Sequence, residues 1–246
     1  MRPWHKAAFI GSVPVAEIVR ALDPGRVETL SLEVNDSVGD LSQLLVFSSL
    51  KSLWLQRCPH VSGLAALSRL PLTDLTLHQV ADLSGLRDLH SLTRLSLDQH
   101  FPYDTLADAL PLGSPLEYLY LGPDTLAATG LTGLDRWPTL ATLCLAAPDD
   151  PLTAADWQQV AALPALKALV MYAPFSASTY ALDVMPELPA VEELRIPGNI
   201  REHSLATLAA RLPSVRKVTV KAYGVTLDLT EYTRHFPDAD ISDDLA

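Results

Sequence analysis

The chain has 246 residues, of which 48% are hydrophobic and 19% charged, a balance that excludes an intrinsically disordered protein. Its formal net charge of -11 repels phosphate backbones and anionic lipid, so we expect no nucleic-acid or membrane binding. The sequence has no run of 18 apolar residues, so no transmembrane helix is predicted. The first residues also lack the apolar core of a signal peptide. With only two cysteines, Cys58 and Cys144, these features predict a cytoplasmic protein.

Residues 1–26 are expected to form an N-terminal cap or a degenerate repeat. Ala7 and Phe9 indicate an early, weak unit, and residues 15–22 indicate a helix that leads into the first clear strand.

Residues 27–222 repeat the phrase Leu-x-x-Leu-x-Leu nine times, at intervals of 20 to 26 residues. These intervals match the period of roughly 20–29 residues of leucine-rich repeats. The second and third apolar residues of a phrase are two apart, so both lie on one side of a short strand and are buried only when units stack. The second residues are Leu30, Leu53, Leu75, Leu95, Leu119, Leu143, Leu169, Leu194 and Val218. The sequence predicts an α/β fold: a single leucine-rich-repeat solenoid over residues 1–246, with a curved parallel sheet on the concave face.

The segments between the strands predict a convex face that changes along the chain. Early units carry the element Asp-Leu-Ser at residues 40–42 and 82–84, which favours tight 3₁₀ turns. Later units carry helical patterns at residues 153–163, ended by Pro164, and 204–212, ended by Pro213. Residues 223–246 are expected to form a C-terminal cap, with a helix over 231–236 and a last short strand over 239–241.

The ninth position of a leucine-rich repeat usually carries Asn or Cys, whose polar group bonds the backbone of the turn. Asn35, Cys58 and Asn199 fit this pattern. The other units carry different residues, so their turns must satisfy the backbone by other means: Val80, His100, Asp124, Pro148, Pro174 and Tyr223.

Strand positions that alternate with the leucines face outward on the concave side, which is the usual binding face of a solenoid. Four of the outward residues are aromatic: Trp54, Tyr118, Tyr120 and Tyr172. Charged and polar residues surround them: Arg57, Asp74, His78, Arg94 and Asp98. Exposed aromatic residues with polar tips are typical of protein interfaces, so we predict a protein- or peptide-binding patch. The alternative is that the aromatic residues cover the sheet or contact another domain of a parent chain.

Catalysis and metal binding are the less favoured alternatives for the same residues. His78 and Asp98 share a register and could pair as in a catalytic dyad near Ser96 and Thr76, but no nucleophile motif holds them and an open sheet excludes no water. A metal site of His78, Asp98 and His100 would need a loop geometry that the sequence does not fix. We therefore predict no enzyme activity and no cofactor.

The two cysteines are expected to remain free. Cys58 and Cys144 lie four repeats apart, which is roughly 19 Å and too far for a disulfide. Cys58 is expected to be a buried turn residue and Cys144 a small concave one.

Residues 50–97 resemble the short repeats of internalins, and the whole chain resembles the C-terminal leucine-rich region of bacterial NACHT NTPases, relatives of NOD-like receptors. The second resemblance depends on residues 52–59 and 72–84 and on an Ala/Pro/Leu-rich style. It implies a ligand-sensing or autoinhibitory module whose upstream NTPase domain oligomerises when the sensor engages its trigger. The sequence contains no Gly-x-x-x-x-Gly-Lys-Ser/Thr phosphate loop, so that domain would lie elsewhere in a parent chain. The alternative is a free-standing scaffold or inhibitor that binds one protein.

Overall fold

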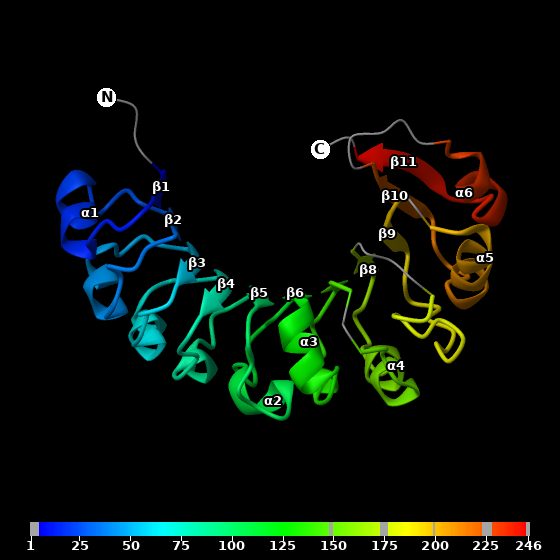
Figure 1. Ribbon diagram of the computed structural model, residues 1–246, viewed down its shortest axis with the longest axis horizontal. Coiled ribbons are helices and arrows are strands. Elements are labelled where there is room, and N and C mark those ends of the chain that lie inside the picture. Colours follow the sequence, from blue (N-terminus) through cyan, green and yellow to red (C-terminus); the bar gives the residue numbers. More distant parts are fainter. Residues whose placement is uncertain (1–4, 148–149, 173–176, 199, 223–227, 245–246) are drawn as a thin grey trace.

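Eleven strands in the described part of the chain form one parallel sheet, ordered along the sequence from β1 to β11. The computed structural model describes residues 5–147, 150–172, 177–198, 200–222 and 228–244. Figure 1 shows the strands on the concave side of an arc and the helices on its convex side. The strands are β1 (Lys6–Ile10), β2 (Thr29–Glu33), β3 (Ser52–Cys58), β4 (Asp74–Val80), β5 (Arg94–Asp98), β6 (Tyr118–Leu121), β7 (Thr142–Leu145), β8 (Ala168–Met171), β9 (Glu193–Pro197), β10 (Lys217–Lys221) and β11 (Asp240–Asp244). The predicted leucine-rich-repeat solenoid is confirmed.

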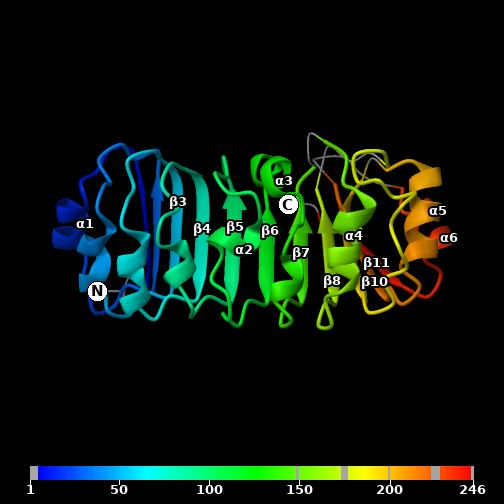
Figure 2. The ribbon, with the colours of Figure 1, turned by 90° about the horizontal axis from the view of Figure 1, so that it is seen from below.

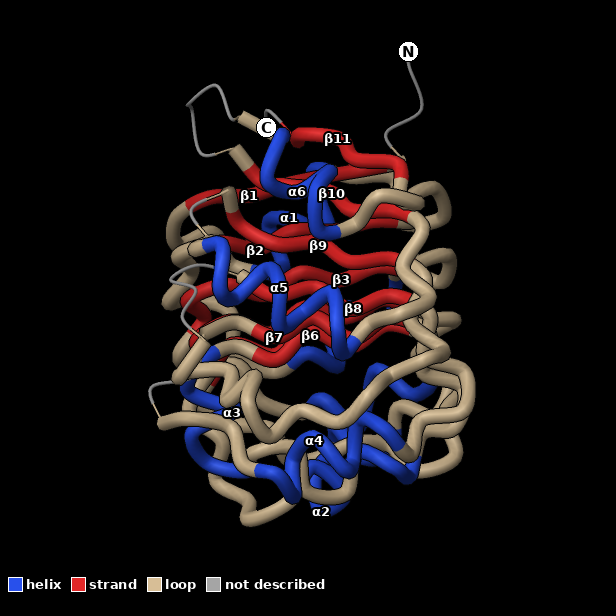
Figure 3. The backbone as a smooth tube through the Cα atoms, turned by 90° about the vertical axis from the view of Figure 1, so that its right-hand side faces the viewer, coloured by secondary structure: helices blue, strands red, loops and turns tan. Residues whose placement is uncertain are grey.

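The strand register follows the repeat phrase. Each second residue of the phrase pairs with its counterpart on the next strand, from Leu30 opposite Leu53 to Leu194 opposite Val218. Figure 3 shows the strands stacked as rungs. The first and last rungs carry the register one unit further at each end, because Ala7 pairs with Leu30 and Ile241 with Val218. The weak first unit thus contributes a strand, and a last strand is present that begins and ends later than expected.

The convex side changes from 3₁₀ turns to helices, as expected, but the change comes earlier. Figure 2 views the molecule from the convex side, with the helical elements in front of the strands. The 3₁₀ helices are η1 (Leu41–Val46), η2 (Leu64–Arg69), η3 (Leu86–Asp88) and η4 (Leu134–Arg136). The α-helices are α1 (Val15–Ala21), α2 (Leu106–Ala109), α3 (Pro123–Thr129), α4 (Ala154–Ala161), α5 (Glu202–Arg211) and α6 (Thr230–His235). The sequence reasoning missed α2 and α3, although Pro123 at the start of α3 and Gly130 at its end are ordinary helix boundary signals. Among the described residues, no helix is both long and apolar enough to cross a membrane.

One continuous hydrophobic core runs through the solenoid from Val15 to Phe236. Three large aromatic side chains lie fully buried inside the later units: Trp137, Trp157 and Tyr180. Their polar atoms bond backbone carbonyls, since Trp157 Nε1 donates to Tyr180 at 2.8 Å and the Tyr180 hydroxyl donates to Leu145 at 3.0 Å. Aromatic residues that belong to the core are therefore separate from those that face the concave side.

Among the turns that the structure describes, the ninth-position turns are regular in the first three clear units. Residues Val34, Arg57 and Gln79 adopt left-handed backbone with φ of 52°, 52° and 53°, and this turns the next residue inward. Asn35 there donates to the Val13 carbonyl at 2.8 Å and accepts from the Ser37 N–H at 2.9 Å.

At the fourth and fifth clear units the turn differs, and His100 and Asp124, the ninth residues there, do not take the inward place of Asn35. Both side chains are exposed: no left-handed residue precedes His100, and Asp124 lies in the first turn of α3. Gln99 is buried instead, and its Oε1 accepts the N–H of Val80 at 3.1 Å. The remaining assigned residues lie outside the described part: Pro148, Pro174, Asn199 and Tyr223.

Candidate binding groove on the concave face

A groove of about 520 Å³ crosses strands β3 to β6 on the concave face. Seven of the nine predicted patch residues line it, together with smaller neighbours. The lining residues are Ser52, Trp54, Asp74, Thr76, Leu77, His78, Arg94, Ser96, Asp98, Tyr118 and Tyr120. The structure therefore brings most of the sequence-predicted patch into one concave surface.

The groove exists because two small outward residues lie between two large ones in the same register. Trp54 pairs with Thr76, Thr76 with Ser96, and Ser96 with Tyr120 across four successive strands. Thr76 and Ser96 leave a floor close to the sheet, whereas the indole of Trp54 and the ring of Tyr120 form the two walls. Trp54 remains 47% exposed, which is high for a large apolar side chain.

Two pairs of polar side chains flank this floor, one toward each end of the strands. The Arg94 Nε atom is 3.7 Å from Asp74 Oδ2, and the Arg94 guanidinium also stacks on the Tyr118 ring at 4.0 Å. On the other side, His78 Nε2 lies 3.3 Å from Asp98 Oδ2. The contact between His78 and Asp98 that their shared register allows is therefore present.

Burial makes both carboxylates of the groove costly to ionise. Desolvation raises the pKa of Asp74 against the attraction of Arg94, and it raises the pKa of Asp98 against the attraction of His78. Asp98 is further held by close packing on Gly122, where a Cβ atom would lie 2.7 Å from the Asp98 Cα and 2.5 Å from its Cγ. Only a glycine at position 122, directly after β6, leaves room for the Asp98 carboxylate at the end of β5.

A second hollow of about 210 Å³ adjoins the groove over β5 to β9 and shares Arg94 and Tyr118 with it. Tyr172 lines this hollow and contacts Tyr120 edge to face, with ring centroids 5.6 Å apart. Glu193 and Arg195 also line it; the sequence placed both at outward positions, but no feature of the repeat distinguished them.

At the base of this second hollow, an outward side chain of β7 and one of β8 are buried. Cys144 is only 1% exposed although it occupies an outward position, as Val170 also does at 7%. Burial raises the pKa of the Cys144 thiol to about 11, and burial likewise raises the pKa of Tyr118 and of Tyr120, so the two hydroxyls remain protonated donors. On this half of the face, larger side chains cover the buried outward residues of β7 and β8.

Some predicted chemistry is not assembled in the groove. Arg57 is exposed in the left-handed turn at the end of β3 and does not line either hollow. His100 is exposed and outside the groove lining, so the weak alternative of a metal site with His78 and Asp98 has no support in this geometry. Within the described residues, no hydrogen bond links Ser96 to His78, as a nucleophile and its base would require. Both cysteines are free and buried, as expected for Cys58.

The groove belongs to a leucine-rich-repeat solenoid, a class that the register of the sheet defines. No protein-family model matches the sequence, and no curated protein is similar to it. Among solved structures, internalin C2 from Listeria monocytogenes is similar at 18% identity and a TM-score of 0.45, over 90% of this chain and 82% of that chain. Because that similarity is low, the assignment of the fold depends on the chain's own strands and leucine columns.

Proposed function

We propose that this chain is a non-catalytic recognition module that binds a protein or peptide segment in the groove over β3 to β6. The observation that carries the proposal is the floor of Thr76 and Ser96 between the walls of Trp54 and Tyr120. Its volume of about 520 Å³ lies within the range of ligand pockets. Trp and Tyr side chains such as the exposed indole and the partly buried phenols of this groove supply much of the binding energy in protein interfaces.

The charge of the chain supports a partner of basic character. A formal net charge of -11 attracts basic partners and speeds their encounter. Inside the groove Asp74 lies 3.7 Å from Arg94 and Asp98 lies 3.3 Å from His78, so a ligand donor can replace or join these present partners. We infer that the bound segment places an apolar side chain against Trp54 and a donor near Asp98.

The test is a selection of peptides from a random displayed library against the immobilised chain. Trp54→Ala is expected to weaken selected peptides at least about tenfold, the loss typical of a central aromatic residue. Val46→Ala is the matched control, because Val46 is 48% exposed but lies on η1 at the convex side (Figure 1). Selected peptides that bind Trp54→Ala as well as the parent chain would place the binding face elsewhere.

The absence of catalysis can be tested at the same groove. A fluorophosphonate probe labels serine nucleophiles that a neighbouring base activates. We expect no labelling of Ser96, because no base is hydrogen-bonded to it in the described structure. Covalent labelling that disappears in His78→Gln would instead establish a hydrolase site.

We also propose a cellular setting: the module acts in the cytoplasm as the sensing or autoinhibitory part of a NACHT-type signalling or defence ATPase. The support is the resemblance carried by residues 52–59 and 72–84. The test is to read the gene upstream of Met1 for a phosphate-loop domain and to measure ATP hydrolysis of that domain with and without this chain. A gene without such a domain, with the chain capturing one protein, would favour the alternative of a free-standing scaffold or inhibitor.

A further inference from the structure

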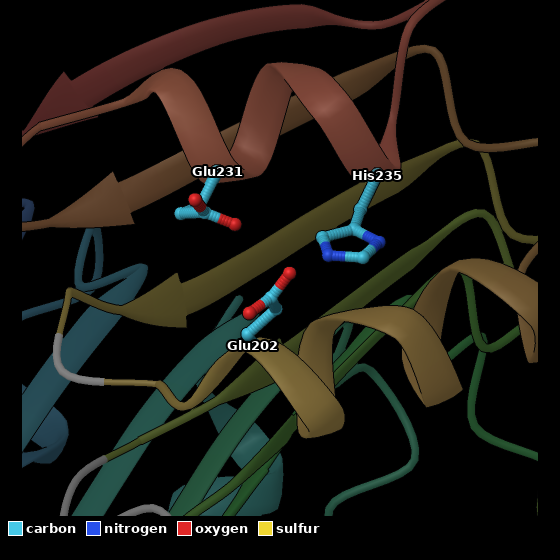
Figure 4. Close-up of side chains that lie close together, drawn as sticks. All are labelled: Glu202, Glu231 and His235. Carbon is cyan, nitrogen blue, oxygen red and sulfur yellow. The ribbon is translucent and has the colours of Figure 1, made fainter.

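The C-terminal cap brings together three side chains of metal-binding chemistry, far along the arc from the groove. Glu231 and His235 are four residues apart on α6, so both lie on the same face of that helix. Glu202 is the first residue of the neighbouring helix α5. Among the described residues, these three offer ligand atoms that all lie within 4.8 Å of one another. Figure 4 shows the two carboxylates and the imidazole directed into the same gap between the helices.

The imidazole is the part of the cluster without a partner. His235 Nε2 is buried and has no hydrogen-bond partner in the described structure. In Figure 4 a ring nitrogen of His235 faces the carboxylate of Glu202. Buried polar atoms are almost always bonded to something, so an unpartnered nitrogen beside two carboxylates indicates a ligand that all three share.

The carboxylates already face one cation, and it does not reach the histidine. Arg234 Nη1 lies 3.3 Å from Glu202 Oε1 and 3.0 Å from Glu231. This arginine explains why two negative groups can lie so close together. Arg234 contacts both carboxylates but not His235, so the imidazole nitrogen and the remaining carboxylate lone pairs are available to bind an ion.

We propose that Glu202, Glu231 and His235 bind a divalent transition-metal ion of the zinc class, which ties α6 to α5 at the end of the solenoid. An imidazole nitrogen with two carboxylates suits Zn²⁺ or Co²⁺, whereas Mg²⁺ and Ca²⁺ prefer ligand sets made of oxygen alone. Three protein ligands leave a further coordination position for water. The ion would compete with Arg234 for the carboxylates, so removal of the arginine should strengthen binding.

The test uses the full chain, without an affinity tag and freed of metal, titrated with Co²⁺ and then with Zn²⁺. One Co²⁺ per chain should bind with visible absorption bands and be displaced by Zn²⁺. His235→Gln is expected to weaken Co²⁺ binding by more than about tenfold. Removal of a residue that merely hydrogen-bonds to a metal ligand already costs about tenfold, and loss of a ligand itself should cost more. His203→Gln is the matched control, since His203 is exposed on α5 outside the cluster.

Two further variants keep the proposal testable if His235→Gln disturbs the fold. Glu202 is exposed, so Glu202→Gln should fold normally and still lose metal. Arg234→Gln should bind the ion more tightly and raise Tm further when Zn²⁺ is added. The proposal is overturned if the chain binds no Co²⁺, if Glu202→Gln binds as well as the parent chain, or if Arg234→Gln gains no affinity.

Discussion

Gly122→Ala tests whether the shape of the groove depends on one missing side chain. Gly122 follows β6 and lies in the turn that starts α3, directly beside Asp98. Its φ is -76°, so glycine is not needed here for left-handed backbone. The new methyl carbon would lie 2.7 Å from the Asp98 Cα, whereas approaches of a Cβ atom under 3.0 Å are essentially never found. A backbone atom cannot rotate away, so β5 and β6 must separate locally.

The expected cost has two parts. Overpacking of this kind costs about 1–3 kcal/mol, and alanine is a poorer N-cap than glycine by up to about 1 kcal/mol. We therefore expect a loss of about 1–4 kcal/mol, which for a chain of this length lowers Tm by roughly 2–16 °C. The Asp98 carboxylate must also turn, which breaks its 3.3 Å contact with His78.

Urea unfolding followed by circular dichroism measures this loss. The control is Gly39→Ala, because a Cβ at Gly39 would meet only the His60 carbonyl, at 3.9 Å. A double variant with Asp98→Ala removes the side-chain part of the clash but leaves the clash with the backbone of β5, so it should recover part of the loss. Equal unfolding midpoints for Gly122→Ala and Gly39→Ala would refute the packing argument.

Three further predictions concern stability. Asp156→Ala should cost about 2–4 kcal/mol in urea unfolding, because the buried carboxylate accepts the N–H groups of Leu131 at 2.7 Å and Thr153 at 2.8 Å; a loss below about 1 kcal/mol would contradict this. Burial raises the pKa of the Cys144 thiol from 9.0 to about 11, so the thiol ionises more readily in the unfolded chain. The free energy of unfolding should therefore be unaffected by this thiol below pH 9 and should fall as the pH rises from 9 to 11; Cys144→Ala should flatten that decline in urea midpoints. Because the pKa of Asp98 is also raised, its charge opposes folding at neutral pH, and Asp98→Asn should raise Tm while it weakens peptide binding; a lower Tm would contradict the burial argument.

The sequence predicted the parts of the fold that depend on a strict period. Stacked rungs require an apolar residue at every second strand position, and a slip of one residue would turn the leucines outward. The register from Leu30 to Val218 could therefore be read directly, and the outward residues followed from it. That is why the sequence alone assigns Trp54 and Tyr120 to the same face.

Features that depend on the turns or on packing between units could not be read in this way. The inward role of Gln99 instead of His100 depends on whether one residue adopts left-handed backbone, which the repeat phrase does not encode. The burial of Cys144 depends on the larger side chains that surround it on the neighbouring strands, although its own position in the phrase is outward. The cluster of Glu202 and His235 joins two helices separated by a whole repeat.

The energetics of the two faces explain why the proposed binding is assigned to the groove and not to the core. Inward positions are almost all leucine, so they stabilise the rungs and carry no information about a partner. The groove contains the opposite choices: an exposed indole at Trp54 and carboxylates at Asp74 and Asp98 that burial makes costly to ionise. Neither choice stabilises the isolated chain, and both would gain a favourable contact if a partner brought a donor and an apolar side chain, as proposed. A partner that covers Trp54 and approaches Asp98 would therefore account for residues that folding alone does not require.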